Sequence, residues 1–206
     1  MNLMNTTITL LIVGALSTLA GCQTASPNVA SSDVASGEVK YGDAKAVENV
    51  SNQFGSTDLQ SIAETMTRSL LQSGVIVNGN RPRLTVAEVK NKTSEYIDTG
   101  SISKSIRSQL LKSGAVRFVA NIDEMQTQTD ELIRQNQSGL YDKKSTKKLG
   151  KMKGADLRLE GEITSIVKKH SGLTDVYYKF SLAMVNIESG ELEWADEKEI
   201  RKQSRR

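Results

Sequence analysis

Residues 157–167 read Leu-Arg-Leu-Glu-Gly-Glu-Ile-Thr-Ser-Ile-Val, and residues 176–184 read Val-Tyr-Tyr-Lys-Phe-Ser-Leu-Ala-Met. In both stretches apolar and polar side chains alternate, which is the pattern of a β-strand with one buried face. Gly172 and the polar residues around it, 168–175, predict a hairpin turn between the two strands. Two antiparallel neighbouring strands are therefore expected.

A third alternation follows these strands. Leu192 and Trp194 alternate with Glu191 and Glu193, and the pair Ser189–Gly190 before them is typical of a tight hairpin turn. The C-terminal residues 198–206 are strongly basic, and their pattern predicts no element. Three consecutive antiparallel strands are the prediction for this part of the chain.

Upstream, apolar residues recur at helical and strand spacings in turn. Thr57 and Gln60 have the spacing of a capping box, while Gly74 and Gly114 are placed to end helices. The expected elements are a helix over 57–73, a strand over 83–91 with a slip in its alternation, a helix over 102–113, a strand over 116–120, a helix from Asn121 with Glu124 in its cap, and a short lysine-rich surface helix within 142–154.

The fold class that follows is α/β in its α+β form. Strands separated by helices favour a βαβ-like start, and the hairpins impose an antiparallel end. We expect a single domain with a mixed central sheet of about five strands and helices packed on it.

The N-terminus predicts export and a lipid anchor. Residues 8–20 are mostly apolar but too few to span a bilayer, and Leu19-Ala-Gly-Cys22 resembles a bacterial lipobox. Cys22 is the single cysteine of the chain, so it cannot form an internal disulfide. An ordinary signal peptide with a chance cysteine, or a start codon placed wrongly, would also fit. Gln23 in place of an aspartate favours the outer membrane, by resemblance to enterobacterial lipoproteins.

The domain organisation follows from this interpretation. We expect a lipoprotein signal peptide over 1–21, a lipidated cysteine and flexible tether over 22–52, and a globular domain over 53–206. A tether of thirty residues reaches about 100 Å fully extended, but its average span as a coil is roughly 30 Å.

No enzyme signature emerges from the sequence. His170 is the single histidine and lies in a basic turn, and no His/Cys spacing suggests a metal site. The segment Gly150–Gly154 lacks phosphate-loop spacing. The net charge of +3 gives no indication of a nucleic-acid partner. A binding module without a catalytic residue, cofactor or small-molecule substrate is expected. Its lysines at 143–153 are either a solvated face or a site for phosphates of lipid headgroups or acidic wall polymers.

Four stretches in this order and spacing resemble one family. They are Phe54–Ala63, Asn91-Lys-Thr93, Gly114–Val119, and Gly154–Gly161 together with Ser189–Trp194. Together they resemble the LpoB-type activator lipoproteins of penicillin-binding proteins. The resemblance implies a fold similar to TolB N-terminal and CsgG-like periplasmic domains, with no cofactor.

The same resemblance implies a function. Such a protein would sit in the outer membrane facing the periplasm, bind the noncatalytic domain of a bifunctional class A penicillin-binding protein, and activate peptidoglycan synthesis allosterically. A subunit of an envelope secretion or assembly complex, similar to the curli-secretion type, is the alternative.

The partner-binding residues are predicted from position. Loops after strand ends often carry function, and the loop after the first strand exposes an aromatic residue beside charges. Tyr177 is added because it should face outward if Tyr178 faces the core. The predicted loop residues are Asn91, Lys92, Thr93, Ser94, Glu95 and Tyr96. A plain solvated connection is the competing interpretation of this loop.

Overall fold

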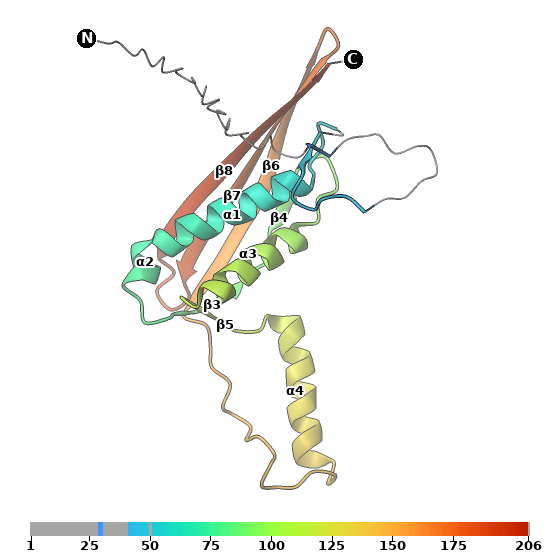
Figure 1. Cartoon of the computed structure of the whole chain (residues 1–206). Coiled ribbons are helices and arrows are strands. Elements are labelled where there is room, and N and C mark those ends of the chain that lie inside the picture. Colours follow the sequence, from blue (N-terminus) through green and yellow to red (C-terminus); the bar gives the residue numbers. More distant parts are fainter. Residues whose placement is uncertain (1–28, 31–40, 50, 206) are drawn as a thin grey trace, which may run out of the picture.

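The computed structural model describes residues 29–30, 41–49 and 51–205 (Figure 1). The helices of this part are α1 (Ser56–Gln72), α2 (Gly74–Val77), α3 (Thr99–Ser113) and α4 (Ile122–Gln137). The strands are β1 (Val29–Ala30), β2 (Val47–Glu48), β3 (Arg83–Val86), β4 (Lys90–Lys92), β5 (Arg117–Phe118), β6 (Leu157–His170), β7 (Leu173–Asn186) and β8 (Leu192–Arg205).

The main sheet has six strands and is mixed. Its order is β5-β3-β6-β7-β8, and β4 also pairs with β6. The pairings of β6 with β3 and β4 are parallel, and those of β7 with β6 and β8 are antiparallel. Since β3 and β4 pair with successive parts of β6, the sheet has five strand positions across. The predicted α+β domain with a mixed sheet is confirmed.

Helices α1 and α3 cover one face of this sheet (Figure 1). Their apolar residues recur every four positions, so a single stripe of each helix faces the strands. The core lies between this stripe and the inward positions of β6 and β7. Among its fully buried side chains are Ile62, Met66, Leu70, Ile102, Leu110, Leu159, Ile163, Tyr178, Phe180 and Met184.

The last three strands are longer than the sequence predicts. Each has 14 residues, and only Ser171 and Gly172, both at positive φ, turn the chain between β6 and β7. The basic C-terminal stretch, which has no predicted element, is the second half of β8. The alternation of apolar and polar residues cannot be seen in this stretch, because inward positions carry lysines. The long stems of these lysines can pack while their charges stay in contact with water.

Two helix predictions are wrong in detail. The N-cap of α1 is Gly55, whose N–H donates to Asp58 at 2.8 Å, so the expected Thr57–Gln60 box does not form. Residues 142–154 form turns rather than a helix. There Asp142 and Thr146 bond backbone groups with their side chains, which competes with helical hydrogen bonds, and Gly150 adopts φ 72°. The predicted cap of α4, Asn121 with Glu124, is confirmed.

Helix α4 projects away from the sheet, and together with residues 138–154 it forms what we call the α4 lobe (Figure 1). No side chain of α4 that the structure describes is buried. At its base Arg107 of α3 donates to Glu124 of α4 at 2.8 Å. The lobe is therefore attached to the domain mainly through its two connections and this ion pair.

Residues just before the globular domain contact α1. Ser56 donates to the carboxylate of Glu48 at 2.7 Å, and the Gln60 amide donates to the carbonyl of Ala44 at 2.7 Å. The end of the predicted tether thus lies against the N-terminal turn of α1. The boundaries at 21 and 52 stay predictions.

Acid is expected to destabilise the domain through carboxylates such as Asp156. The backbone N–H of Arg83 donates to Asp156 at 2.9 Å, and this bond lowers the pKa of that carboxyl group. A depressed folded-state pKa stabilises the fold above the unfolded value of about 4, and that contribution is lost as the pH falls through the folded-state pKa. The melting temperature should therefore be lower at pH 3 than at pH 7. Asp156→Asn should narrow that difference, and an unchanged difference would contradict this role.

Candidate partner-binding surface

The second face of the sheet carries no helix in the part of the chain that the structure describes (Figure 1). Outward positions of β6, β7 and β8 form it, and we call it the open face. Ion pairs cross it: Lys92 with Glu162 at 2.6 Å, and Lys179 with Glu197 at 3.2 Å. Exposed pairs of this kind contribute about 0–1 kcal/mol each. A partner could therefore exchange them for its own ion pairs at little loss of free energy.

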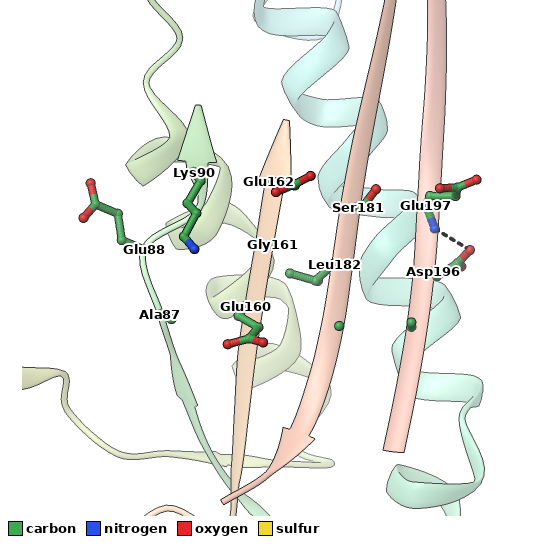
Figure 2. A pocket seen from close by; sticks show the side chains of 12 residues that line it. Ala87, Glu88, Lys90, Glu160, Gly161, Glu162, Ser181, Leu182, Asp196 and Glu197 are labelled. Carbon is green, nitrogen blue, oxygen red and sulfur yellow. Dashed lines mark hydrogen bonds between the residues drawn. The ribbon is translucent and has the colours of Figure 1, made fainter. Parts of the chain in front are cut away.

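A shallow hollow of about 600 Å³ lies on the open face (Figure 2). Small residues at outward positions make its floor: Ser181, Ala183 and Ala195. Figure 2 shows Glu160 and Glu162 on one side of the hollow and Glu197 on the other. The hollow can accommodate a protruding side chain, and its charged rim favours a polar or cationic one.

Backbone geometry beside the hollow is irregular. Val86 pairs with Leu159 and Lys90 with Glu162, so residues 87–89 hold one residue more than the facing part of β6. This is the slip in the alternation of 83–91. Opposite it, a Cβ on Gly161 would lie 2.4 Å from the carbonyl oxygen of Ser181. Only glycine allows β6 and β7 to approach this closely here.

The loop after β4 is shaped by its own side chains. Asn91 accepts from the Thr93 N–H at 2.9 Å and from its hydroxyl at 2.8 Å, and it donates to the carbonyl of Glu95 at 2.9 Å. Tyr96 follows with its side chain 93% exposed. Asn91 and Thr93 therefore hold the loop, while Tyr96 is presented to solvent.

Glu95 connects this loop to the core. Its carboxylate accepts a hydrogen bond from the buried Tyr178 hydroxyl, and also from the N–H of Phe54 at 3.3 Å. Burial raises the pKa of Tyr178, and the carboxylate of Glu95 raises it further, so the hydroxyl stays protonated and donates. The position of Tyr96 is thus tied to a rigid part of the sheet.

The structure brings only some of the predicted site residues together. Lys92 and Tyr177 share the open face, two strands and two residues apart, which corresponds to roughly 12 Å. A hydrogen bond to Glu199 raises the pKa of Tyr177. Ser94 is exposed on the loop, and Glu95 points to the core side. Cys22 lies outside the described residues.

Sequence reasoning missed the hollow. A signal for it was present, because Ser181 and Ala183 occupy outward positions where neighbouring strands carry long polar side chains. Without the strand register, however, the sequence does not show that Ala195 lies beside Ala183.

Other kinds of site find no support in residues 29–30, 41–49 and 51–205. No group of three or more His, Cys, Asp or Glu side chains there could hold a metal ion. His170 is exposed at the end of β6, beside the turn. No helix in the described ranges is both long and apolar enough to cross a bilayer.

A mixed sheet with helices on one face and an open, charged second face defines the class of this chain: a small one-sided α+β domain. A family model described as the peptidoglycan-synthase activator LpoB matches residues 58–200. The chain therefore belongs to the LpoB family of peptidoglycan-synthase activators, a regulatory rather than a catalytic family. The resemblance read from the sequence is confirmed.

Solved structures that match this chain include members of the same family. The LpoB C-terminal domain from Escherichia coli is 14% identical, with 69% of this chain and 98% of that chain covered and a TM-score of 0.42. The corresponding domain from Salmonella enterica is 15% identical over the same shares, with a TM-score of 0.41. Full-length E. coli LpoB is 14% identical over 96% of both chains, with a TM-score of 0.40. No curated protein matches the sequence.

Proposed function

We propose that this chain is an outer-membrane lipoprotein, anchored through Cys22 and facing the periplasm, that activates a bifunctional class A penicillin-binding protein. It binds the noncatalytic domain of that synthase and has no enzymatic activity of its own. The observation that carries the proposal is the family match, which runs from the first turn of α1 into β8 and so includes most of the sheet and of the two helices that cover it. An activator that binds the active state of the synthase more tightly raises the population of that state.

The contact surface we propose is the loop after β4 together with the adjoining part of the open face. Tyr96 is a large, exposed aromatic residue held by a rigid loop, which is the kind of side chain that dominates protein interfaces. Lys92 and Tyr177 lie on the neighbouring face and add charge and a second aromatic ring. These three side chains are the ones we expect the synthase to contact.

Tyr96→Ala is expected to weaken binding to the synthase at least about tenfold, because a buried interface tyrosine often contributes 2 kcal/mol or more. The measurement uses the chain from Gln23 onward with a purified class A penicillin-binding protein from the same source. Binding and glycan synthesis from lipid II are followed together. Tyr41→Ala is the matched control, since Tyr41 is equally exposed but lies before α1.

The activator function and the proposed contact surface would be contradicted by different outcomes. If the unaltered chain neither binds nor stimulates while circular dichroism shows it folded, the activator function is wrong and the secretion-assembly alternative gains weight. If the chain stimulates and Tyr96→Ala does so equally well, the function stands and the proposed contact surface is wrong.

Cys22→Ala is expected to release the protein from membranes. Two or more acyl chains hold a protein firmly, whereas an unmodified chain has no comparable anchor. Fractionation of cells with labelled palmitate is the measurement, and label should be lost together with membrane association. Ser26→Ala is the control. A Cys22→Ala protein that stays in the outer-membrane fraction would exclude anchoring through this cysteine.

A further inference from the structure

We propose that the α4 lobe is a docking surface for an anionic phospholipid bilayer. The inference goes beyond activation of the synthase and does not depend on it. It rests on the charge of the lobe, on its exposed apolar side chains, on the contacts that hold its shape, and on its place in the fold.

Positive charge on the lobe is concentrated in the segment that follows α4, whereas α4 itself carries Asp123, Glu124, Asp130 and Glu131 against Arg134, so residues 122–154 have a formal charge of +2. Between residues 138 and 155 there are six lysines and one acidic residue, Asp142, which gives a formal charge of +5 from six positive charges less one negative. All six lysines are exposed, and none forms an ion pair with another described residue. The lysines are Lys143, Lys144, Lys147, Lys148, Lys151 and Lys153. Their charge is complementary to the phosphates of an anionic leaflet.

Apolar side chains are exposed among these lysines. Leu140 is 82% exposed, Leu149 is 54% and Met152 is 44%. Binding of water-soluble anions alone does not require exposed apolar side chains. At a bilayer, lysines lie among the headgroups while apolar side chains enter the acyl boundary. The combination therefore favours a lipid surface over a free phosphate or a wall polymer.

Specific contacts hold the segment against α4. The Asn136 amide donates to the carbonyl of Lys147 at 2.9 Å, and the Arg134 guanidinium lies 5.2 Å from the centre of the Tyr141 ring. The Asp142 carboxylate accepts from the Lys144 N–H at 2.9 Å, so the one acidic residue shapes a turn. These contacts hold residues 141–147 beside the C-terminal part of α4.

The lobe lies at the far end of the domain from the segment that leads in from the predicted tether (Figure 1). Residues 44–48 contact the first turn of α1, whereas α4 leaves the domain after β5, beyond the other end of α1. A 17-residue helix is about 25 Å long. The lobe can therefore meet a surface on the side opposite to the tether.

The test is sedimentation of the chain from Gln23 onward with lipid vesicles. This chain keeps every buried core residue and lacks the cysteine that would anchor it. It should bind vesicles of phosphatidylethanolamine with phosphatidylglycerol and not vesicles of phosphatidylcholine alone. Lys143, Lys144, Lys147 and Lys148 changed together to Gln should weaken binding at least about tenfold, since one basic residue near an anionic surface contributes about fivefold.

A matched variant removes the same number of positive charges from outside the lobe, so its total charge equals that of the lobe variant. Lys104, Lys112, Lys168 and Lys169 are exposed on α3 and β6, and changing all four to Gln should weaken binding less than threefold. If this variant loses as much as the lobe variant, attraction is general and the lobe is not a docking surface. Absence of binding by the unaltered chain would also overturn the proposal.

Leu149→Ser with Met152→Ser keeps every charge and separates a bilayer from a soluble polyanion. This pair should weaken vesicle binding several-fold, with circular dichroism unchanged. Equal affinity of the unaltered chain for inorganic polyphosphate and for the vesicles, together with no effect of the pair, would assign the lobe to soluble anions instead.

Discussion

Lys202→Met should lower the free energy of unfolding by about 3 kcal/mol, because it leaves a buried carboxylate without its cation. The Lys202 amine donates to Asp58 at 2.9 Å and to the carbonyl of Gln53 at 2.6 Å. The side chains of Lys202 and Asp58 are only 17% and 8% exposed. Methionine keeps most of the stem but cannot pair with Asp58. Urea unfolding followed by circular dichroism measures the change.

Lys179→Met is the matched control for Lys202→Met. Lys179 also forms an ion pair, in its case between β7 and β8 with Glu197 at 3.2 Å, but both partners are substantially exposed. Its loss should change stability by less than about 1 kcal/mol. Adding Asp58→Asn to Lys202→Met should restore part of the lost stability. A Lys202→Met protein as stable as the control would show that the pair is not coupled to folding.

Tyr178→Ala is expected to lower the free energy of unfolding by about 4 kcal/mol. The ring is fully buried and meets Phe54 edge to face, with centroids 5.8 Å apart, and the hydroxyl donates to Glu95. Removing a buried aromatic side chain typically costs about 3–5 kcal/mol. Thermal or urea unfolding measures this change directly.

Tyr178→Phe separates the hydroxyl from the ring. Only the hydrogen bond is lost, so the expected change is about 2 kcal/mol, because Glu95 is left with an unpaired carboxylate oxygen. The Tyr96 loop should also become more mobile, which faster amide exchange at residues 93–97 would report. Unchanged exchange with reduced stability would mean that Glu95 supports the fold without positioning the loop.

The strong periodic signals of the sequence predicted the architecture well. Most apolar positions in α1, α3, β6 and β7 are buried because one face of each element must leave water, while Leu111, Ile166 and Val167 are exposed. Gly114, at φ 70°, and Gly190, at φ 76°, end a helix and turn a hairpin where expected. These features depend on local geometry, which a single sequence records directly.

The secondary structure was predicted poorly in two stretches where charged residues obscure the periodicity of apolar residues. In β8 the inward positions hold Lys198 and Lys202, so the pattern of residues 198–206 predicts no element although they continue a half-buried strand. Over 142–154 the narrow apolar edge of Leu149 and Met152 among lysines predicts a helix, yet side-chain bonds to the backbone and the positive φ of Gly150 give turns. Charge alone does not reveal which lysines have partners, because those partners are far away in sequence.

The candidate site was half predictable. Tyr96 and Lys92 follow a recognisable strand end, and Tyr177 follows from alternation beside a core tyrosine. That Glu95 turns inward to Tyr178, 83 residues away, depends on tertiary packing that the sequence does not show. The hollow at Ser181 and Ala195 depends on strand register in the same way.

Strand β8 ends the sheet, so in the described structure its outer backbone groups have no strand beside them. A free strand edge of this length can recruit a second chain and begin a growing aggregate. Here the edge carries a charged side chain at nearly every position from Asp196 to Lys202. A chain added in register would bring like charges together. This edge therefore resists the parallel, in-register stacking of identical strands from which fibrils grow.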